Sequence, residues 1–212
     1  MFDFVFVVLT YRNSEDLKNF IQSAVKITET WKIIVVNSFF DEQSLEEIKK
    51  IAISNNCDFL NVENKGYGSG NNKGIEYALQ NYQFKFLVIS NPDIEIIQLS
   101  TKYIKKIGVG IFGPRIIRRN GRDQNPYFPY KSKIVLRLRC IYAITGILPF
   151  YYCSILLNKF YRFTFRVIGK RQVYSLHGSF LIFSYSILKD LIPIFDENIF
   201  LFAEEEYLAL KA

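Results

Sequence analysis

The stretch that decides the fold is an apolar run ending in a polar turn, Phe84-Lys85-Phe86-Leu87-Val88-Ile89-Ser90-Asn91-Pro92-Asp93. Residues 84–89 have the nearly continuous apolar character of a strand buried on both faces of a parallel sheet. Asp93 follows the rigid Pro92, where a carboxylate is placed to bind a hard cation such as Mg²⁺, which prefers carboxylates together with substrate phosphates. A cation there would neutralise charge on a departing diphosphate. A turn that caps the next helix is the alternative.

The residues before this stretch alternate between strand and helix patterns. Apolar runs predict strands at residues 2–9, 31–36 and 57–60. Apolar residues at helical spacing predict helices at residues 14–25, 45–52 and 75–82. Ser14 is the expected N-cap of the first helix. The alternation predicts βαβ units, and therefore an α/β fold with a mostly parallel central sheet flanked by helices.

Polar side chains gather where each of the four strands is predicted to end. They are Tyr11 and Asn13 after the first strand, Asn37 after the second, residues 64–72 after the third and Asp93 after the fourth. Ligands of open α/β sheets bind beyond the carboxyl ends of the strands. Each turn alone could be purely structural, but four successive polar strand ends favour a ligand site.

Residues 64–74 are rich in glycine and asparagine, and we expect them to form a loop before the third helix. Glycines let the backbone approach a ligand closely, and a helix N-terminus favours phosphate. The pattern is not the Rossmann dinucleotide fingerprint, because Asn71 takes the place of its third glycine. It is not a P-loop either, because Gly74 follows Lys73.

The second half of the chain is less regular. Residues 109–117 and 176–183 are predicted strands, and residues 186–191 a short helix. Three adjacent carboxylates, Glu204, Glu205 and Glu206, follow an apolar aromatic run. Crowding and partial burial raise carboxyl pKa values, which suits a general base. The alternative is a solvated acidic helix start.

Charge is distributed unevenly along the 212 residues, whose formal net charge is +7. Residues 124–189 hold ten basic and no acidic side chains, whereas the rest of the chain holds 17 basic and 20 acidic ones. This asymmetry indicates a localised anionic partner. The uncharged run at residues 141–157, with basic flanks, predicts that residues 131–171 lie on an anionic membrane surface.

Three other interpretations of this basic insert remain open: a packed core helix, an oligomer contact and a membrane span, for which the run is short. Nucleic acid is not expected, because the run is too apolar for a phosphate groove. The three cysteines fit neither a disulfide framework nor a zinc site, which indicates a reducing compartment. Asp3 interrupts the first apolar run, so we expect no signal peptide and a cytoplasmic protein, peripheral on the inner face of the cell membrane.

Together these motifs resemble the family-2 glycosyltransferases, in particular their rhamnosyltransferase-like branch. The resemblance lies in residues 8–13, 35–38, 64–75, 91–93, 113–116, 121–124, 177–179 and 195–208, in the family's order. It implies a GT-A-type nucleotide-sugar-binding fold with a basic aromatic helical insert. It also implies one catalytic domain, with residues 1–117 as the nucleotide-sugar-binding half, 118–175 as the insert and 176–212 as the acceptor-side strand and base segment.

The resemblance implies an inverting transfer from a UDP-, dTDP- or GDP-sugar to a hydroxyl of a cell-surface polysaccharide or lipid-linked oligosaccharide, with Mg²⁺ or Mn²⁺. The implied donor-site residues are Thr10, Tyr11, Asn13, Asn37, Asn64, Gly68, Asn71, Asn91 and Asp93. Asp93 would hold the metal. Glu205 would be the catalytic base, with Glu204 as the second candidate, and His177 and Gly178 would lie on the acceptor side.

The chain departs from the family pattern at three positions. Asn37 and Tyr207 replace usual aspartates, and Glu205 stands where aspartate is commoner. Relatives usually continue through further helices, so we expect a C-terminal truncation. These features leave open a catalytically inactive, membrane-associated scaffold domain. A nucleotidyltransferase is disfavoured, because residues 10–13 lack the glycine-rich basic loop that such enzymes carry.

Overall fold

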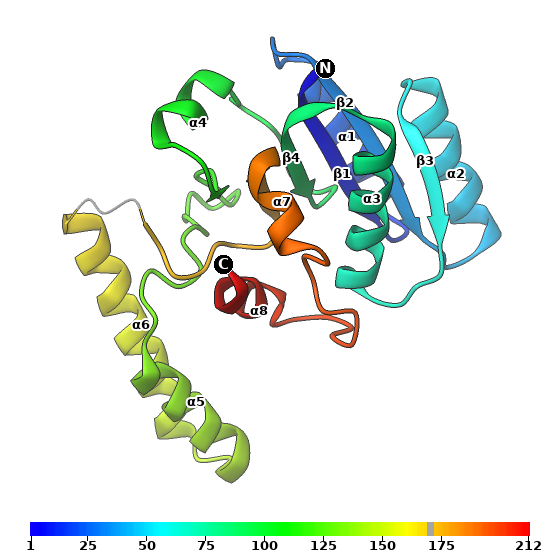
Figure 1. Cartoon of the computed structure of the whole chain (residues 1–212). Helices are drawn as coiled ribbons and strands as arrows, with labels where there is room; N and C mark the ends of the chain where they lie inside the picture. The colour runs from blue at the N-terminus through cyan, green and yellow to red at the C-terminus, as the bar shows by residue number, and fades with distance from the viewer. Residues whose placement is uncertain (169–171) are drawn as a thin grey trace. The chain divides into compact units, whose positions relative to one another are not determined.

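The chain forms a mixed six-stranded sheet in the structure, a computed structural model that describes residues 1–168 and 172–212 (Figure 1). The strand order is β3-β2-β1-β4-β6-β5. The strands are β1 Phe2–Thr10, β2 Trp31–Ser38, β3 Asp58–Val62, β4 Phe84–Ser90, β5 Ile111–Phe112 and β6 Phe180–Ser184. The first four are parallel, β6 is antiparallel to β4, and β5 is antiparallel to β6. The predicted α/β class is therefore confirmed.

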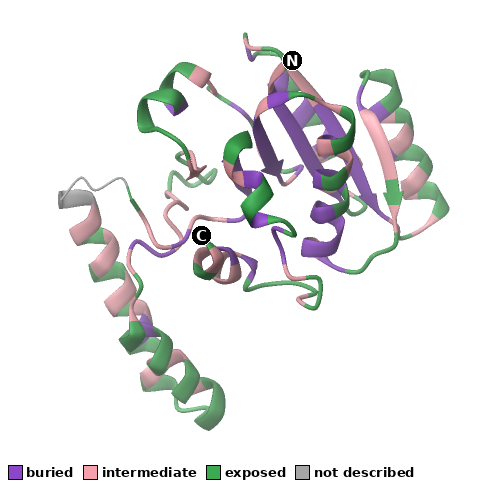
Figure 2. Ribbon diagram, in the orientation of Figure 1, coloured by how far each residue is buried: buried purple, intermediate pink, exposed green. Residues whose placement is uncertain are grey.

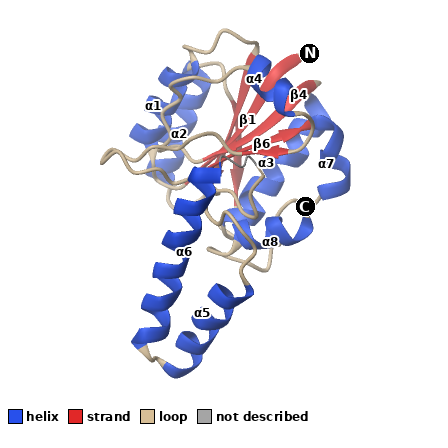
Figure 3. Cartoon of the chain, turned by 90° about the vertical axis from the view of Figure 1, so that its left-hand side faces the viewer, coloured by secondary structure: helices blue, strands red, loops and turns tan. Residues whose placement is uncertain are grey.

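Helices cover both faces of this sheet. They are α1 Ser14–Ala24, α2 Glu42–Ser54, α3 Tyr67–Asn81 and α7 Tyr185–Leu191. The same unit also contains α4 Thr101–Ile107 and α8 Glu204–Lys211. Figure 3 shows α1 and α2 on one face and α3 and α7 on the other. The apolar runs that predicted β1, β2 and β4 are buried on both sides, as Figure 2 shows for the centre of the sheet, whereas β3 at its edge is only half-buried. This double coverage is why the strand sequences lack polar alternation.

Two predicted details are wrong. Asn13, not Ser14, occupies the N-cap position of α1, and its side chain makes no capping bond. The strand predicted at residues 109–117 is reduced to Ile111–Phe112. Pro114 has no N–H to donate to the ladder, and only Ile111 and Phe112 pair with β6. Gly110, just before β5, still accepts a hydrogen bond from the Ser184 N–H.

The predicted glycine loop at residues 64–74 is also wrong, because α3 begins at Tyr67. A Cβ on Gly70 would lie 2.5 Å from Leu9, and one on Gly74 would lie 2.3 Å from Val7 and 2.8 Å from Val36. The glycines therefore let the helix approach the sheet, and the favourable packing outweighs their poor helix propensity.

The chain divides into two compact units. The sheet unit consists of Met1–Pro114 and Gly178–Ala212, and the insert unit of Arg115–His177. In the insert unit, α5 Lys133–Thr145 and α6 Leu148–Ile168 lie side by side as a helical hairpin (Figure 3). Lys170 and Arg171 of the predicted membrane-facing region lie outside the described residues. Among the described residues, no helix combines the length and apolarity needed to cross a bilayer.

Candidate active site

The carboxyl ends of β1, β2 and β3 bring three polar side chains into one row. Strand register pairs Thr10 with Asn37, and Asn37 with Asn61. The Asn37 Nδ2 atom donates to Asn61 Oδ1 over 2.8 Å, and the Thr10 hydroxyl donates to the Val36 carbonyl. The Asn37 Oδ1 atom is buried and has no hydrogen-bond partner among the described residues. It is therefore a buried acceptor that no described protein group satisfies, at the carboxyl end of β2.

An aromatic surface lies beside this row. The Tyr11 and Phe40 rings meet edge to face with centroids 5.5 Å apart, and the Arg12 guanidinium lies 4.1 Å from the Phe40 centroid. Tyr11 and Phe40 are both exposed. Exposed π faces beside a hydrogen-bonding row can stack a planar base. Asn13 has a different role, since its amide accepts from the Tyr11 N–H and donates to Asp16, which shapes the turn.

Asp41 lies in the same region and begins α2. It accepts a hydrogen bond from the Ser44 N–H over 2.8 Å. Bonds from Ser44, and then the charge of Arg12, hold the pKa of Asp41 below its ordinary value. The carboxylate therefore serves as a helix cap, and Arg12 gains a nearby negative charge.

The residues at the start of α3 form hydrogen bonds and packing contacts with other parts of the protein. Asn64 Oδ1 accepts from the Gly66 N–H, in the turn before the helix. A Cβ on Gly68 would lie 2.9 Å from Phe195 Cβ, so the backbone at this predicted donor-site residue is packed against the segment before α8. Asn71 is buried and donates to the Tyr67 carbonyl, and its Oδ1 has no partner among the described residues.

Asn72 anchors the segment that leads to the acidic cluster. Its Nδ2 donates to the Phe195 carbonyl over 2.9 Å and to Glu197 over 3.2 Å, and its Oδ1 accepts from the Phe195 N–H over 3.2 Å. These bonds join residues 123 and 125 positions apart in the sequence. Asn72 thus connects α3 to residues 195–197.

The turn after β4 leaves Asp93 exposed, with no hydrogen bond or ion pair to any described residue. Pro92 is buried beneath it, and the Asn91 N–H donates to the Ser179 carbonyl over 2.9 Å. Because β6 is antiparallel to β4, its first residues lie at the carboxyl end of β4, where Ser90 pairs with Phe180. The predicted metal-binding carboxylate therefore stands on a turn fixed to Ser179.

Glu205 is hydrogen-bonded to Gly178, the residue before Ser179. Its Oε1 accepts from the Gly178 N–H over 3.0 Å, and the Tyr67 hydroxyl donates to the Gly178 carbonyl over 2.9 Å. A Cβ on Gly178 would lie 2.9 Å from Glu205 Oε1, so a larger residue there would displace the carboxylate from its present position. Burial, and then the charges of Glu205 and Glu204, raise the pKa of Tyr67, which keeps its hydroxyl a donor.

Glu204 differs from Glu205 although the two are adjacent. It is buried, and its Oε1 has no partner among the described residues. Burial, together with the charges of Glu205 and Glu206, raises the pKa of Glu204. Both residues begin α8, whose N-terminal dipole stabilises carboxylates.

His177 belongs to the insert unit. Its N–H donates to Asn125 Oδ1 over 2.7 Å, its Nε2 lies 3.2 Å from the Gln124 amide, and its ring meets Tyr127 edge-on. His177, a predicted acceptor-side residue, thus contacts the nearby residues 124, 125 and 127 of the same unit, and its acceptor-side role stays a prediction.

The sequence reasoning missed three site residues, Asn61, Tyr67 and Asn72. All three stand in or beside the glycine- and asparagine-rich stretch, and only their long-range partners reveal their roles. Among the residues that the structure describes, no three His, Cys, Asp or Glu side chains come together to hold a metal. Hard cations such as Mg²⁺ bind one or two carboxylates together with phosphate and water, and the exposed Asp93 could supply one such carboxylate.

The sequence comparisons identify the family of the chain. The model of the family described as Glycosyl transferase family 2 matches residues 5–192. The chain therefore belongs to this family. A curated relative, the low-salt glycan biosynthesis hexosyltransferase Agl10 of Haloferax volcanii, is 26% identical over 215 residues, which cover 99% of the chain and 61% of that relative.

Solved structures show the same fold. TarS 1–349 of S. aureus superposes with a TM-score of 0.62 at 16% identity, covering 99% of the chain and 54% of that structure's chain. A complex of the same protein with UDP-GlcNAc gives 0.60 at 17%, covering 99% and 53%. The mannosyltransferase PcManGT of Pyrobaculum calidifontis, in complex with GDP-Man and Mn²⁺, gives 0.59 at 15%, covering 100% and 53%. The predicted GT-A fold is therefore confirmed.

Proposed function

We propose that the protein transfers a sugar from a nucleotide diphosphate sugar to a hydroxyl group of a glycan, with inversion at the anomeric carbon. One observation carries the proposal. The adjacent residues Gly178 and Ser179 are hydrogen-bonded to Glu205 and to the Asp93-bearing turn, respectively. This arrangement combines a candidate base with a candidate diphosphate-side carboxylate at the carboxyl edge of the sheet, where α/β folds bind ligands.

The donor nucleotide would occupy the ends of β1 and β2. The exposed Tyr11 ring would stack on the base, and the buried Asn37 Oδ1 atom would accept one of its N–H groups. The Asn37 Nδ2 group donates to Asn61, so this hydrogen bond fixes the orientation of the Asn37 amide and leaves its Oδ1 atom for the ligand. The base could be that of a UDP-, dTDP- or GDP-sugar.

The donor diphosphate would lie beside Asp93 with Mg²⁺ or Mn²⁺. Asp93 is exposed and has no partner among the described residues, which suits one carboxylate ligand in a shell completed by phosphate and water. When bound, such a cation stabilises the negative charge of the leaving nucleoside diphosphate.

Glu205 would act as the general base. The Gly178 N–H holds one oxygen of its carboxylate, which fixes the orientation of the group. The carboxylate would remove the proton from the acceptor hydroxyl as that oxygen bonds to the anomeric carbon. The bond from this carbon to the diphosphate oxygen would break, and the nucleoside diphosphate would leave with the electron pair. Glu204 is the second candidate, but its burial makes its charged form unfavourable.

The acceptor would be a cell-surface polysaccharide or a lipid-linked oligosaccharide. Support comes from the relative described as a glycan biosynthesis hexosyltransferase, of which the chain spans 61%. We propose a hexosyl or rhamnosyl group as the transferred sugar. Gly178 and His177 would lie on the acceptor side.

A donor panel tests the proposal. Native protein, Asp93→Ala and the matched control Asp190→Ala would be mixed with UDP-, GDP- and dTDP-sugars and Mn²⁺, and released nucleoside diphosphate measured. Asp190 is an equally exposed carboxylate of the sheet unit. We expect one donor class to turn over in the native and Asp190→Ala proteins and not in Asp93→Ala. Absence of turnover and binding for every donor would instead support an inactive scaffold domain.

A further inference from the structure

We propose that the α5–α6 hairpin docks on an anionic lipid bilayer, with its uncharged tip among the lipids and its basic legs at the phosphates. The tip is defined as residues 140–158, and the legs as the remaining residues of α5 and α6. The inference concerns the insert unit and does not depend on the chemistry proposed for the sheet unit.

The sequence of the tip contains no charged residue from Cys140 to Asn158. Gly146 ends α5 with a left-handed φ of 70°, and its N–H donates to the Tyr142 carbonyl. α6 begins two residues later, and Tyr142 meets Tyr151 with ring centroids 5.1 Å apart. The uncharged run is therefore folded back on itself, which contradicts the alternative of a single membrane-spanning helix.

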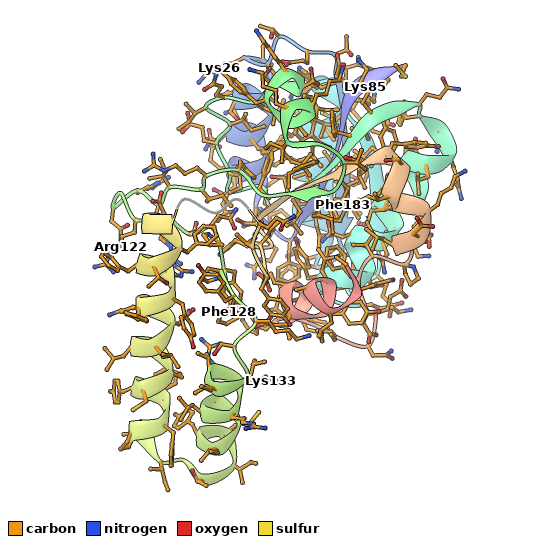
Figure 4. The ribbon with its side chains drawn as sticks, turned by 60° about the vertical axis from the view of Figure 1, so that its left-hand side comes forward. Lys26, Lys85, Arg122, Phe128, Lys133 and Phe183 are labelled. Atoms are coloured by element: carbon orange, nitrogen blue, oxygen red, sulfur yellow. The ribbon has the colours of Figure 1, made fainter. Side chains whose placement is uncertain are left out.

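The hairpin leaves its apolar side chains uncovered. Of the described side chains of α5 and α6, only Val135 and Ser154 are buried. Ile144 is 84% exposed, and the other large exposed residues of the tip include Ile147, Leu148, Tyr152 and Leu156. Figure 2 shows the exposed surface along both helices, and Figure 4 shows their side chains projecting outward from Lys133 onward. A packed core helix would not present these residues to water.

Charge identifies the partner. The insert unit contains 13 basic residues and one acidic residue, Asp123, which pairs with Arg115. No acidic residue lies on either helix, so the exposed cations of the legs, Lys133, Arg137 and Lys159, have no carboxylate on the hairpin to pair with. A surface that combines exposed apolar residues with unneutralised cations is complementary to an anionic bilayer interface.

The dimensions fit one leaflet. Eleven residues separate Leu148 from Lys159, which corresponds to about 16 Å of helix. Half of the hydrocarbon core of a bilayer is about 15 Å thick. An inserted tip would thus bring Lys159 to the level of the phosphates, where its charge remains solvated.

Vesicle flotation of the full chain gives the first test. We expect flotation with vesicles of phosphatidylcholine and phosphatidylglycerol, weak flotation with phosphatidylcholine alone, and loss of flotation as NaCl is raised. Binding to both vesicle types equally, or to neither, would overturn the proposal.

Two sets of variants separate charge from apolar insertion. The change Lys133→Ala/Arg137→Ala/Lys159→Ala should weaken binding by about 100-fold, at about fivefold per cation. The matched control Lys102→Ala/Lys105→Ala/Lys106→Ala removes three exposed cations from α4 of the other unit. It should bind like the native protein. Equal weakening by both triple variants would show an effect of net charge alone and overturn the docking surface.

For the tip, Ile144→Ser/Leu148→Ser/Leu156→Ser should weaken binding by about 1000-fold, since each of the three aliphatic side chains contributes about tenfold when buried. The control Val25→Ser/Ile97→Ser/Val109→Ser changes exposed apolar residues of the sheet unit and should have no effect. If the tip variant bound normally, the insertion would be wrong. A native dimer that the tip variant abolishes, without lipid binding, would assign the surface to a second copy instead.

Insertion depth can be measured because Trp31 is the single tryptophan. On a Trp31→Phe background, Tyr152→Trp and Phe160→Trp form a matched pair, since both positions are 59% exposed and lie on α6. Lipids brominated in the acyl chain should quench the tryptophan at position 152 more strongly than that at 160. Equal quenching, or none, would contradict an inserted tip.

Discussion

The sheet unit and the insert unit use apolar residues in opposite ways. In the sheet unit, β1, β2 and β4 bury their apolar side chains. A few buried polar atoms of this unit, such as Asn37 Oδ1 and Glu204 Oε1, have no hydrogen-bond partner among the described residues. In the insert unit, the helices expose apolar side chains and bury almost none. Buried unpaired polar atoms indicate a small polar ligand, whereas exposed apolar residues beside cations indicate a lipid surface.

This contrast assigns separate tasks to the two units, so variants in one unit should leave the property of the other unchanged. In the proposed division, the sheet unit would supply the donor site and the candidate base, and the insert unit would supply the attachment to a bilayer.

Replacing the candidate base should have the largest effect. Glu205→Gln keeps the shape and the acceptor for the Gly178 N–H but cannot take a proton, so turnover should fall by about 10²- to 10⁴-fold with little change in donor affinity. Glu204→Gln is the matched control and should retain most of the activity. Steady-state kinetics would measure both, and the reverse ranking would transfer the assignment to Glu204.

Asn72 should be the most sensitive structural residue of the site. Asn72→Ala removes three hydrogen bonds and strands the Phe195 N–H and carbonyl groups, so we expect a loss of about 1–3 kcal/mol in the free energy of unfolding. Urea denaturation would measure it, and hydrogen exchange should show reduced protection around residues 195–203. The control Asn81→Ala, which removes one exposed bond in the same helix, should change both little. Equal losses of stability in Asn72→Ala and Asn81→Ala would contradict the role of Asn72 in holding residues 195–197.

At the glycines of α3 that face the sheet, a change to alanine should destabilise the protein, although alanine usually stabilises a helix. Alanine normally stabilises a helix interior by about 1 kcal/mol relative to glycine. Gly74→Ala should instead lower the free energy of unfolding, by up to about 2 kcal/mol, because the new Cβ meets the rigid Val7 and Val36 side chains. Thermal unfolding would be compared with Lys73→Ala at the exposed neighbouring position. A stabilised Gly74→Ala protein would disprove the close packing.

The smallest effect concerns pH. The folded-state pKa of Glu204 is raised above its ordinary value of 4.5, so the folded protein holds this proton more tightly than the unfolded chain does. Stability therefore falls as pH rises from below 4.5 through the folded-state pKa. Glu204→Gln should match native stability in acid and exceed it at neutral pH. Denaturation series at several pH values would check this, and parallel profiles would contradict the burial argument.

Continuous apolar runs made the parallel strands predictable, because burial on both faces leaves a strong local pattern. The run at residues 84–89 and β4 Phe84–Ser90 differ by one residue. The start of α3 was not predictable, because glycine and asparagine favour loops and only the facing Leu9, Val7 and Val36 side chains explain a helix there.

The site was predictable in part for the same reason. Polar residues after Leu9, Val36 and Ile89 mark the strand ends, and the register brings Thr10 and Asn37 together as expected. The contacts of Tyr67 and Asn72 span more than 100 residues, so no local pattern indicates them. The roles assigned to Asp93 and Glu205 remain predictions.

Titration of nucleotide sugars tests the division of tasks most directly. UDP-, GDP- and dTDP-sugars would be titrated into the native protein, Asp93→Asn and the tip variant Ile144→Ser/Leu148→Ser/Leu156→Ser, with and without Mn²⁺. We predict that one donor class binds the native protein and the tip variant equally in Mn²⁺, and binds Asp93→Asn at least about 100-fold more weakly. Native-like, Mn²⁺-dependent binding by Asp93→Asn, or no binding of any donor by the native protein, would contradict the account.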